Sequence, residues 1–165
     1  MHTPPAKTLV YGPVPSRRLG LSLGVDLIPH KICTFDCLYC QVGRTTRLGL
    51  TRQDFGASPE QVVAQVAAAL EGAPDTQVIT LAGSGEPTLY LSLEPLIEGL
   101  RSLTHLPLVL LTNGSLLWQP EVRRAVNLLD RVYPSLDAAD PETFSRINRP
   151  APGLTLDSFL LGLTR

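Results

Sequence analysis

The sequence is short of several residue types, and each shortage excludes a class of protein. It has only 3 cysteines in 165 residues, an odd number that does not suit a disulfide framework. No apolar run approaches the roughly 18 residues that a membrane-spanning helix needs, and neither a signal peptide nor an internal repeat is visible. With 44% hydrophobic and 18% charged residues, the chain is typical of one soluble, cytoplasmic domain with a substantial core.

Two common catalytic signatures are missing as well. Neither the nucleophile motif G-x-S-x-G nor the Walker phosphate loop occurs. A serine-triad hydrolase and a P-loop nucleotidase therefore have no support in the sequence. The residues that are concentrated in one place are the cysteines.

All three cysteines, Cys33, Cys37 and Cys40, lie within eight residues and form a C-x3-C-x2-C pattern. Cysteine thiolates are the usual ligands of iron–sulfur clusters. Three of them would hold three irons of a [4Fe–4S] cluster and leave the fourth iron without a protein ligand. An incompletely coordinated metal is typical of a site where chemistry occurs, whereas a closed one is usually structural.

Two other interpretations of the cysteines stay open from the residues alone. A Cys3His zinc site would need a histidine as fourth ligand, and the candidates are His30, His2 and His105. Zinc ligands more often come as two separated pairs, and no second pair is visible. A thioredoxin-like motif would use C-L-Y-C alone and would leave Cys33 without a role.

The cysteine loop resembles the signature of the radical S-adenosylmethionine (SAM) superfamily, C-x3-C-x-aromatic-C, with Tyr39 at the aromatic position. The flanking segments G-P-V-P-S-R-R-L-G (12–20) and Y-C-Q-V-G-R-T-T (39–46) are similar to one bacterial subgroup of this superfamily. Members of that subgroup are called radical SAM proteins or Fe–S oxidoreductases. They are distant relatives of the wyosine-base tRNA-modifying enzymes.

The resemblance implies both cofactors and partners. A [4Fe–4S] cluster would be held by Cys33, Cys37 and Cys40, and SAM would bind the open iron through its amino and carboxylate groups. An electron donor such as flavodoxin or ferredoxin would reduce the cluster. SAM would then be cleaved to methionine and a 5′-deoxyadenosyl radical that abstracts a hydrogen from the substrate.

Strand and helix patterns alternate along the chain and predict an α/β fold. The predicted strands cover 22–28, 77–82, 106–111 and 131–136, and the predicted helices cover 59–71, 93–103, 120–129, 141–147 and 157–163. Four strand–helix units with right-handed crossovers predict a curved parallel sheet. The resemblance implies a partial (β/α) barrel of the radical SAM type, with about four of an expected six βα units.

The predicted domain organisation is simple. We expect residues 1–10 to be a flexible N-terminal segment and residues 11–165 to be the radical SAM core domain. Because the chain is shorter than is usual for the family, we expect the core to be incomplete at its C-terminus.

Small and polar residues follow the predicted strands, where parallel α/β folds bind their ligands. Ser84, Gly85 and Glu86 lie in the segment G-S-G-E-P, which is similar to the G-G-E-P motif of the family. Backbone carbonyls of such a loop, together with the Glu86 carboxylate, would receive the ammonium group of SAM. The alternative is an ordinary turn between a strand and a helix.

Four further residues complete the predicted SAM site. Asn113, in Thr112-Asn113-Gly114, resembles residues that bond the SAM ribose, and the alternative is a simple turn. Ser135 and Asp137 alternate at the end of the fourth strand, so both would face the site; capping of the next helix is the alternative for Asp137. The Tyr39 ring would cover the cluster or the adenine, unless it only packs in the core.

Charge and one further motif bear on the substrate. Residues 1–53 carry seven Lys and Arg against two Asp, which would suit a polyanion such as tRNA. The favoured alternatives are a solvated basic surface and arginines that bind the SAM carboxylate. Arg17 or Arg18 is a candidate for that carboxylate or for a substrate phosphate, unless both are simple surface charge. The segment 148–150 matches the N-R-P of the subgroup, without a physical role that the sequence reveals.

Alternatives to a hydrogen-abstracting enzyme of unknown substrate are a glycyl-radical-enzyme activase and a non-catalytic cluster or zinc module.

Overall fold

The computed structural model describes residues 8–164 and contains one five-stranded sheet. Its strand order is β1 (Val10–Ser16), β2 (Gly20–Val25), β5 (Val78–Leu81), β6 (Leu108–Thr112) and β7 (Arg131–Pro134). The strands from β2 to β7 are parallel to one another, and β1 pairs with β2 antiparallel. The structure thus has the α/β fold with four parallel strands that the sequence predicted.

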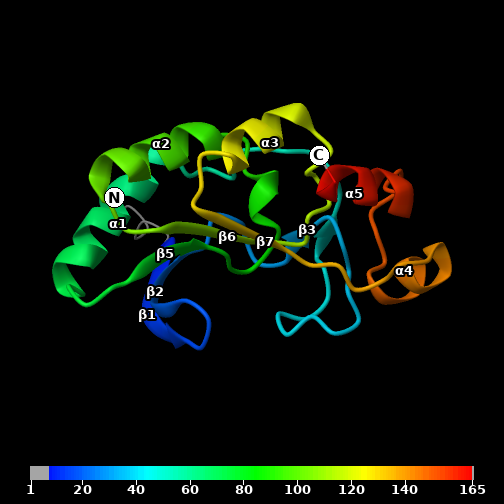
Figure 1. Ribbon diagram of the computed structural model, residues 1–165, viewed down its shortest axis with the longest axis horizontal. Coiled ribbons are helices and arrows are strands. Elements are labelled where there is room, and N and C mark those ends of the chain that lie inside the picture. Colours follow the sequence, from blue (N-terminus) through cyan, green and yellow to red (C-terminus); the bar gives the residue numbers. More distant parts are fainter. Residues whose placement is uncertain (1–7, 165) are drawn as a thin grey trace, which may run out of the picture.

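Helices cover one face of this sheet. Figure 1 shows α1 (Pro59–Gly72), α2 (Leu93–Leu103) and α3 (Pro120–Val126) side by side along that face. The N-terminal hairpin β1–β2 and the cysteine loop extend to the other side, and α4 (Pro141–Ile147) and α5 (Leu156–Leu163) lie beside the loop (Figure 1). A short 3-10 turn, η1 (Pro87–Leu89), follows β5, and a two-stranded sheet of β3 (Ile32–Cys33) and β4 (Arg47–Leu48) begins and ends the cysteine loop.

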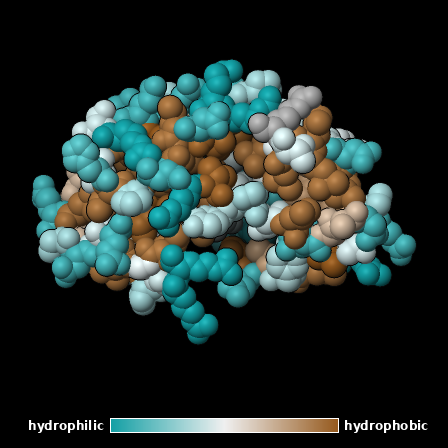
Figure 2. All heavy atoms as spheres, in the orientation of Figure 1, coloured by the Kyte–Doolittle hydropathy of each residue, from teal (hydrophilic) through white to brown (hydrophobic). Residues whose placement is uncertain are grey.

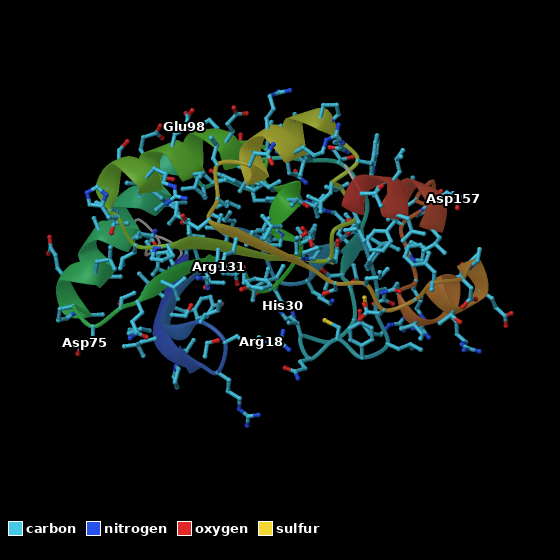
Figure 3. All side chains as sticks on the ribbon, in the orientation of Figure 1. Arg18, His30, Asp75, Glu98, Arg131 and Asp157 are labelled. Atoms are coloured by element: carbon cyan, nitrogen blue, oxygen red, sulfur yellow. The ribbon has the colours of Figure 1, made fainter. Side chains whose placement is uncertain are left out.

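The core lies between the sheet and the three covering helices. The side of α2 that faces the sheet is fully buried through Leu93, Leu96, Ile97 and Leu100, whereas Glu98 points outward from the same helix (Figure 3). In the view of Figure 2, hydrophilic atoms cover much of the outer surface along the helices, and hydrophobic atoms lie beneath them. None of the helices among residues 8–164 is long and apolar enough to cross a membrane.

Several predicted boundaries agree with the structure because they rest on local chemistry. Ser58 caps α1 at the predicted helix start, and the reciprocal hydrogen bonds between Ser58 and Gln61 form a capping box. The Asp140 side chain caps α4 by accepting a hydrogen bond from the N–H of Thr143.

Strand β1 was missed by the sequence analysis. It contains Pro13 and Pro15, and proline has no N–H to donate to the hydrogen bonds of a sheet. Because β1 is an edge strand, proline is tolerated there. Residues 1–7 of the predicted flexible segment lie outside the described residues. The rest of that segment is folded, because Leu9 is buried and β1 begins at Val10.

Candidate active site

One cavity of about 500 Å3 lies at the carboxyl ends of the parallel strands and brings together most of the predicted site. It is lined by all three cysteines and by Tyr39, Ser84, Gly85, Glu86, Asn113 and Ser135. Of the residues predicted for this site, only Asp137 is absent from its lining. The strands are parallel and in register, so their ends meet at one edge, and this explains the convergence.

A second small hydrophobic cluster anchors the cysteine loop. Phe35, within the loop, contacts Phe144 of α4 edge to face at 5.5 Å and Phe159 of α5 at 5.9 Å. Cys33 belongs to the same cluster. These ring contacts therefore hold the cysteine loop against α4 and α5, which lie more than 100 positions away in the sequence.

The protonation of the thiols follows from their surroundings. Burial raises the pKa of Cys33 to about 11, with a further contribution from the Glu86 charge, and burial also raises the pKa of Cys37. Burial acts in the same direction on Cys40, but a hydrogen bond from the Lys31 ammonium and N–H donors of the loop outweigh it and lower its pKa. All three are free cysteines.

The two described histidines that could have completed a zinc site lie outside the cysteine cavity. Among residues 8–164, no three His, Cys, Asp or Glu side chains gather closely enough to hold a single metal ion. His30 is exposed and does not belong to the described lining of the cavity, and His105 is exposed before the start of β6, at the opposite end of that strand. His2 lies outside the described residues. The thiols instead share one open cavity, which suits a cluster that needs room for a further ligand.

The predicted Gly83–Pro87 loop packs directly on the start of the cysteine loop. The N–H of Lys31 donates to the Ser84 carbonyl at 2.8 Å, and the N–H of Glu86 donates to the Ile32 carbonyl at 3.2 Å. Asp26, which follows β2, also binds this loop. Its carboxylate accepts hydrogen bonds from the N–H and the hydroxyl of Ser84. Asp26 is a residue that the sequence analysis missed.

Gly85 permits the close approach of these two loops, and Gly85→Ala is expected to weaken the fold. A Cβ at this position would lie 2.2 Å from the Ile32 carbonyl oxygen and 2.4 Å from Cγ2 of Ile28. Overpacking of this kind costs about 1–3 kcal/mol, which denaturant unfolding would measure. Gly72→Ala is the control, since nothing lies within 4 Å of its Cβ; equal effects of the two changes would contradict the packing role.

Glu86 has a different place from the one that the sequence suggested. Its side chain is 2% exposed, and Oε1 accepts hydrogen bonds from the N–H of Thr88 at 3.0 Å and from the hydroxyls of Thr88 and Thr112 at 2.6 Å. Oε2 accepts from the N–H of Asn113 at 2.8 Å. Burial raises the pKa of the Glu86 carboxyl, while these donors oppose the shift. The carboxylate is thus committed to joining the ends of β5 and β6 rather than free for the ammonium of SAM.

The remaining predicted residues form two groups. Asn113 is turned toward the cysteine loop, where Nδ2 donates to Oγ1 of Thr34 at 2.7 Å. The hydroxyl of Tyr39, a half-exposed residue, donates to Asp137, which is itself exposed and is not part of the cavity lining. Ser135 is exposed and lines the cavity itself.

Two more charged residues line the cavity, Lys31, which the sequence analysis missed, and Arg18, which it considered as a ligand of an anionic group. Lys31 is buried and lines the cavity beside the cysteines. Arg18, at the tip of the β1–β2 hairpin, is exposed and reaches the same cavity from the other side (Figure 3). For Lys31 the available signal was its position two residues before the first cysteine.

A cavity of similar volume, about 520 Å3, lies near the starts of α2 and α3. Its charged lining mixes both signs, with Arg52 and Arg124 against Glu94 and Glu121. Arg52 is bound there to the carbonyls of the chain, and no cysteine lines this cavity. The chemistry-bearing residues are therefore in the cavity of the cysteine loop.

Comparison with known proteins found a family model and several similar proteins. Residues 27–164 match the family model of the radical SAM superfamily. A UPF0026 protein of Methanocaldococcus jannaschii is 40% identical over 158 residues, covering 94% of this chain and 49% of that protein. A UPF0026 protein of Synechocystis sp. is 41% identical over 156 residues, covering 93% of this chain and 57% of that protein.

Two more distant or longer proteins are also similar. A protein named GTPase Obg of Brachyspira hyodysenteriae is 41% identical over 154 residues, covering 93% of this chain and 22% of that protein. The crystal structure of archaeal TYW1 has a TM-score of 0.48 and 17% identity, covering 87% of this chain and 49% of that one. The chain spans 22% to 57% of the length of these curated relatives. The chain belongs to the radical SAM superfamily, whose members are enzymes that bind a [4Fe–4S] cluster and SAM.

Proposed function

We propose that this chain forms the cluster- and SAM-binding part of a radical SAM enzyme. The observation that supports it best is the shared cavity, where Cys33, Cys37 and Cys40 face the Gly83–Pro87 loop with no fourth cysteine in the chain. Bound there and reduced, the cluster would supply the electron that cleaves SAM to methionine and a 5′-deoxyadenosyl radical, which abstracts a hydrogen from the substrate.

The residues of the chain would provide binding and orientation. The three thiolates would hold the cluster, and the polar backbone of Ser84 and Gly85 would face the amino acid part of SAM. Ser135 and the Tyr39 ring, both part of the cavity wall, would contact the nucleoside part. We assign Glu86, Asn113 and Asp137 to positioning, because their side chains are bound within the protein.

The Arg18 guanidinium would receive an anionic group. It lies at the cavity mouth, opposite the cysteines, and no described carboxylate pairs with it within 4 Å. A guanidinium binds a carboxylate or a phosphate in bidentate fashion. The carboxylate of SAM and a phosphate of the substrate are the two groups that fit.

The substrate is the open part of this proposal. Of the three arginines near the cysteine loop that would suit tRNA, Arg52 is committed to backbone carbonyls. The other two are exposed, with Arg44 beside Asp36 and Arg47 over the Phe55 ring. We therefore give tRNA no preference over a small substrate. Reduction by flavodoxin or ferredoxin, and a cytoplasmic location where thiols stay reduced, belong to the same proposal.

The test is anaerobic reconstitution with iron and sulfide, followed by EPR of the reduced protein with and without SAM. We expect a reduced [4Fe–4S] signal that changes when SAM is added, and 5′-deoxyadenosine formed with dithionite as reductant. A protein that assembles no cluster, or a cluster whose signal is indifferent to SAM, would contradict the proposed function.

A further inference from the structure

We propose that Lys31, Asn113 and Asn148 are a set of hydrogen-bond donors, one for each cysteine of the loop, that hold the three thiolates and raise the reduction potential of the cluster. The proposal rests on the proposed function, because it concerns the same cluster. It goes beyond that function by naming the residues that decide how easily the cluster is reduced. We call these three residues the donor set.

The shortest of the three contacts is made by Lys31. Its Nζ donates to Sγ of Cys40 at 2.9 Å, and the residue is only 3% exposed. A buried ammonium is stable only beside an anionic or strongly polar partner. Cys40 is the partner that the described residues provide, and a thiolate there would meet that need.

The backbone holds Lys31 in this place. Its φ is +55°, in the left-handed region, which a residue with a side chain adopts at a cost unless its surroundings enforce it. Its N–H donates to the Ser84 carbonyl at 2.8 Å, and its own carbonyl accepts from the N–H of Thr46 at 2.9 Å. The chain is therefore fixed on both sides of the side chain that reaches Cys40.

Two asparagines make the corresponding contacts to the other cysteines. Nδ2 of Asn113 lies 3.5 Å from Sγ of Cys33, and Nδ2 of Asn148 lies 3.7 Å from Sγ of Cys37. Both distances suit N–H···S hydrogen bonds, which are longer than those to oxygen. The donors come from three separate parts of the fold, namely the loop before β3, the end of β6 and the end of α4.

The orientation of the Asn148 amide is determined by what surrounds it. The residue is 2% exposed, and its Oδ1 is buried without a hydrogen-bond partner among the described residues. Turning the amide would place Oδ1 against the Asp137 carboxylate, which lies 3.3 Å from Nδ2, and against the Cys37 sulfur. The Tyr39 hydroxyl, 3.2 Å from Nδ2, already donates its hydrogen to Asp137 and so would not satisfy the turned oxygen. Two acceptors would then face a third. The protein tolerates one unsatisfied carbonyl oxygen in order to direct the N–H groups at the thiol and the carboxylate.

The segment around Asn148 is bound to the cysteine loop along its length. The N–H of Asp36 donates to the Asn148 carbonyl at 3.0 Å, the N–H of Leu38 to the Ile147 carbonyl at 2.9 Å, and the N–H of Ala151 to the Thr34 carbonyl at 2.8 Å. These bonds hold the amide of Asn148 beside Cys37. They give the N-R-P segment the physical role that the sequence did not reveal.

The direction of the effect follows from electrostatics. Reduction adds one negative charge to the cluster and its thiolates, and N–H donors and a nearby ammonium stabilise that charge. Lys31 brings a full positive charge in a buried place, where charges interact more strongly than in water. Its removal should therefore lower the potential more than the removal of either asparagine.

The test is the midpoint potential of the reconstituted cluster, measured by EPR-monitored redox titration in the parent and in Lys31→Met, Lys31→Arg and Asn148→Leu. In Lys31→Met we expect at least a tenfold shift toward oxidised cluster at a fixed potential, about 59 mV for a one-electron couple. Asn148→Leu should shift the potential in the same direction by less. Lys31→Arg, which keeps the positive charge, should have a midpoint potential close to that of the parent. Asn127→Leu, on the surface at the end of α3, is the matched control and should change nothing.

The outcomes separate this inference from the proposed function. If the parent assembles no cluster, the proposed function is wrong and this inference falls with it. If the parent and variants carry equal amounts of cluster at equal potentials, only this inference is overturned. If Lys31→Met fails to assemble a cluster, the other two variants test the inference. An unchanged potential in Asn148→Leu together with no cluster in Lys31→Arg would show that the donor set only packs against the loop. That result would overturn the inference.

Discussion

Cys40→Ser is expected to reduce cluster content and SAM cleavage to background. Serine keeps the size and the hydrogen bond from Lys31, which lies 2.9 Å from Sγ, but a hydroxyl does not ionise near neutral pH and cannot replace a thiolate ligand. Cys40 is also less buried than Cys33, so its loss should disturb the fold less than the loss of Cys33. Iron and sulfide analysis after anaerobic reconstitution, with quantification of 5′-deoxyadenosine, measures both effects.

The fold of the variant provides the control for this prediction. The Cys40→Ser protein without iron should still fold, with a loss of no more than about 1–3 kcal/mol in denaturant unfolding, because the buried Lys31 ammonium then has only a neutral hydroxyl as its partner. A variant that retains a full cluster and a SAM-dependent EPR signal would show that the loop 33–40 is not the ligand set. The same result with Cys33→Ser and Cys37→Ser would remove the basis of the proposed function.

Glu86→Gln is expected to destabilise the protein by about 1–3 kcal/mol, the usual effect of leaving buried polar groups unsatisfied. The Glu86 carboxylate accepts hydrogen bonds from three residues and is buried. A glutamine can present only one oxygen, so its NH2 group would face either the N–H of Asn113 or the N–H of Thr88 as donor against donor. Denaturant unfolding without iron measures the loss.

The same change should also weaken SAM binding, because the Asn113 backbone is held at the cavity by Oε2 of Glu86. Glu98→Gln is the matched control, since Glu98 is exposed on the outer side of α2 (Figure 3) and should change stability by less than about 0.5 kcal/mol. Equal stabilities of the two variants would show that the buried hydrogen bonds contribute nothing to the fold.

Local chemistry was sufficient for much of the fold. The capping residues Ser58 and Asp140 and the amphipathic pattern of residues 93–103 predicted helices that the structure contains. These signals work because capping and burial of one helix face depend on residues a few positions apart. Strand β1 lacked such a signal, since its tolerance of proline depends on being at the edge of a sheet.

The sequence by itself determined the family and predicted where the candidate site lies. The C-x3-C-x2-C loop and the polar residues after each predicted strand are contiguous patterns, and parallel strands necessarily bring their ends to one edge. Only the tertiary structure decided what each side chain does there. Asn148 lies beside Cys37 across 111 positions and Asn113 beside Cys33 across 80, and such contacts depend on how α4 and β6 pack rather than on spacing. For the same reason Glu86 became an internal acceptor, since its three partners reach it only when β5 and β6 lie in register.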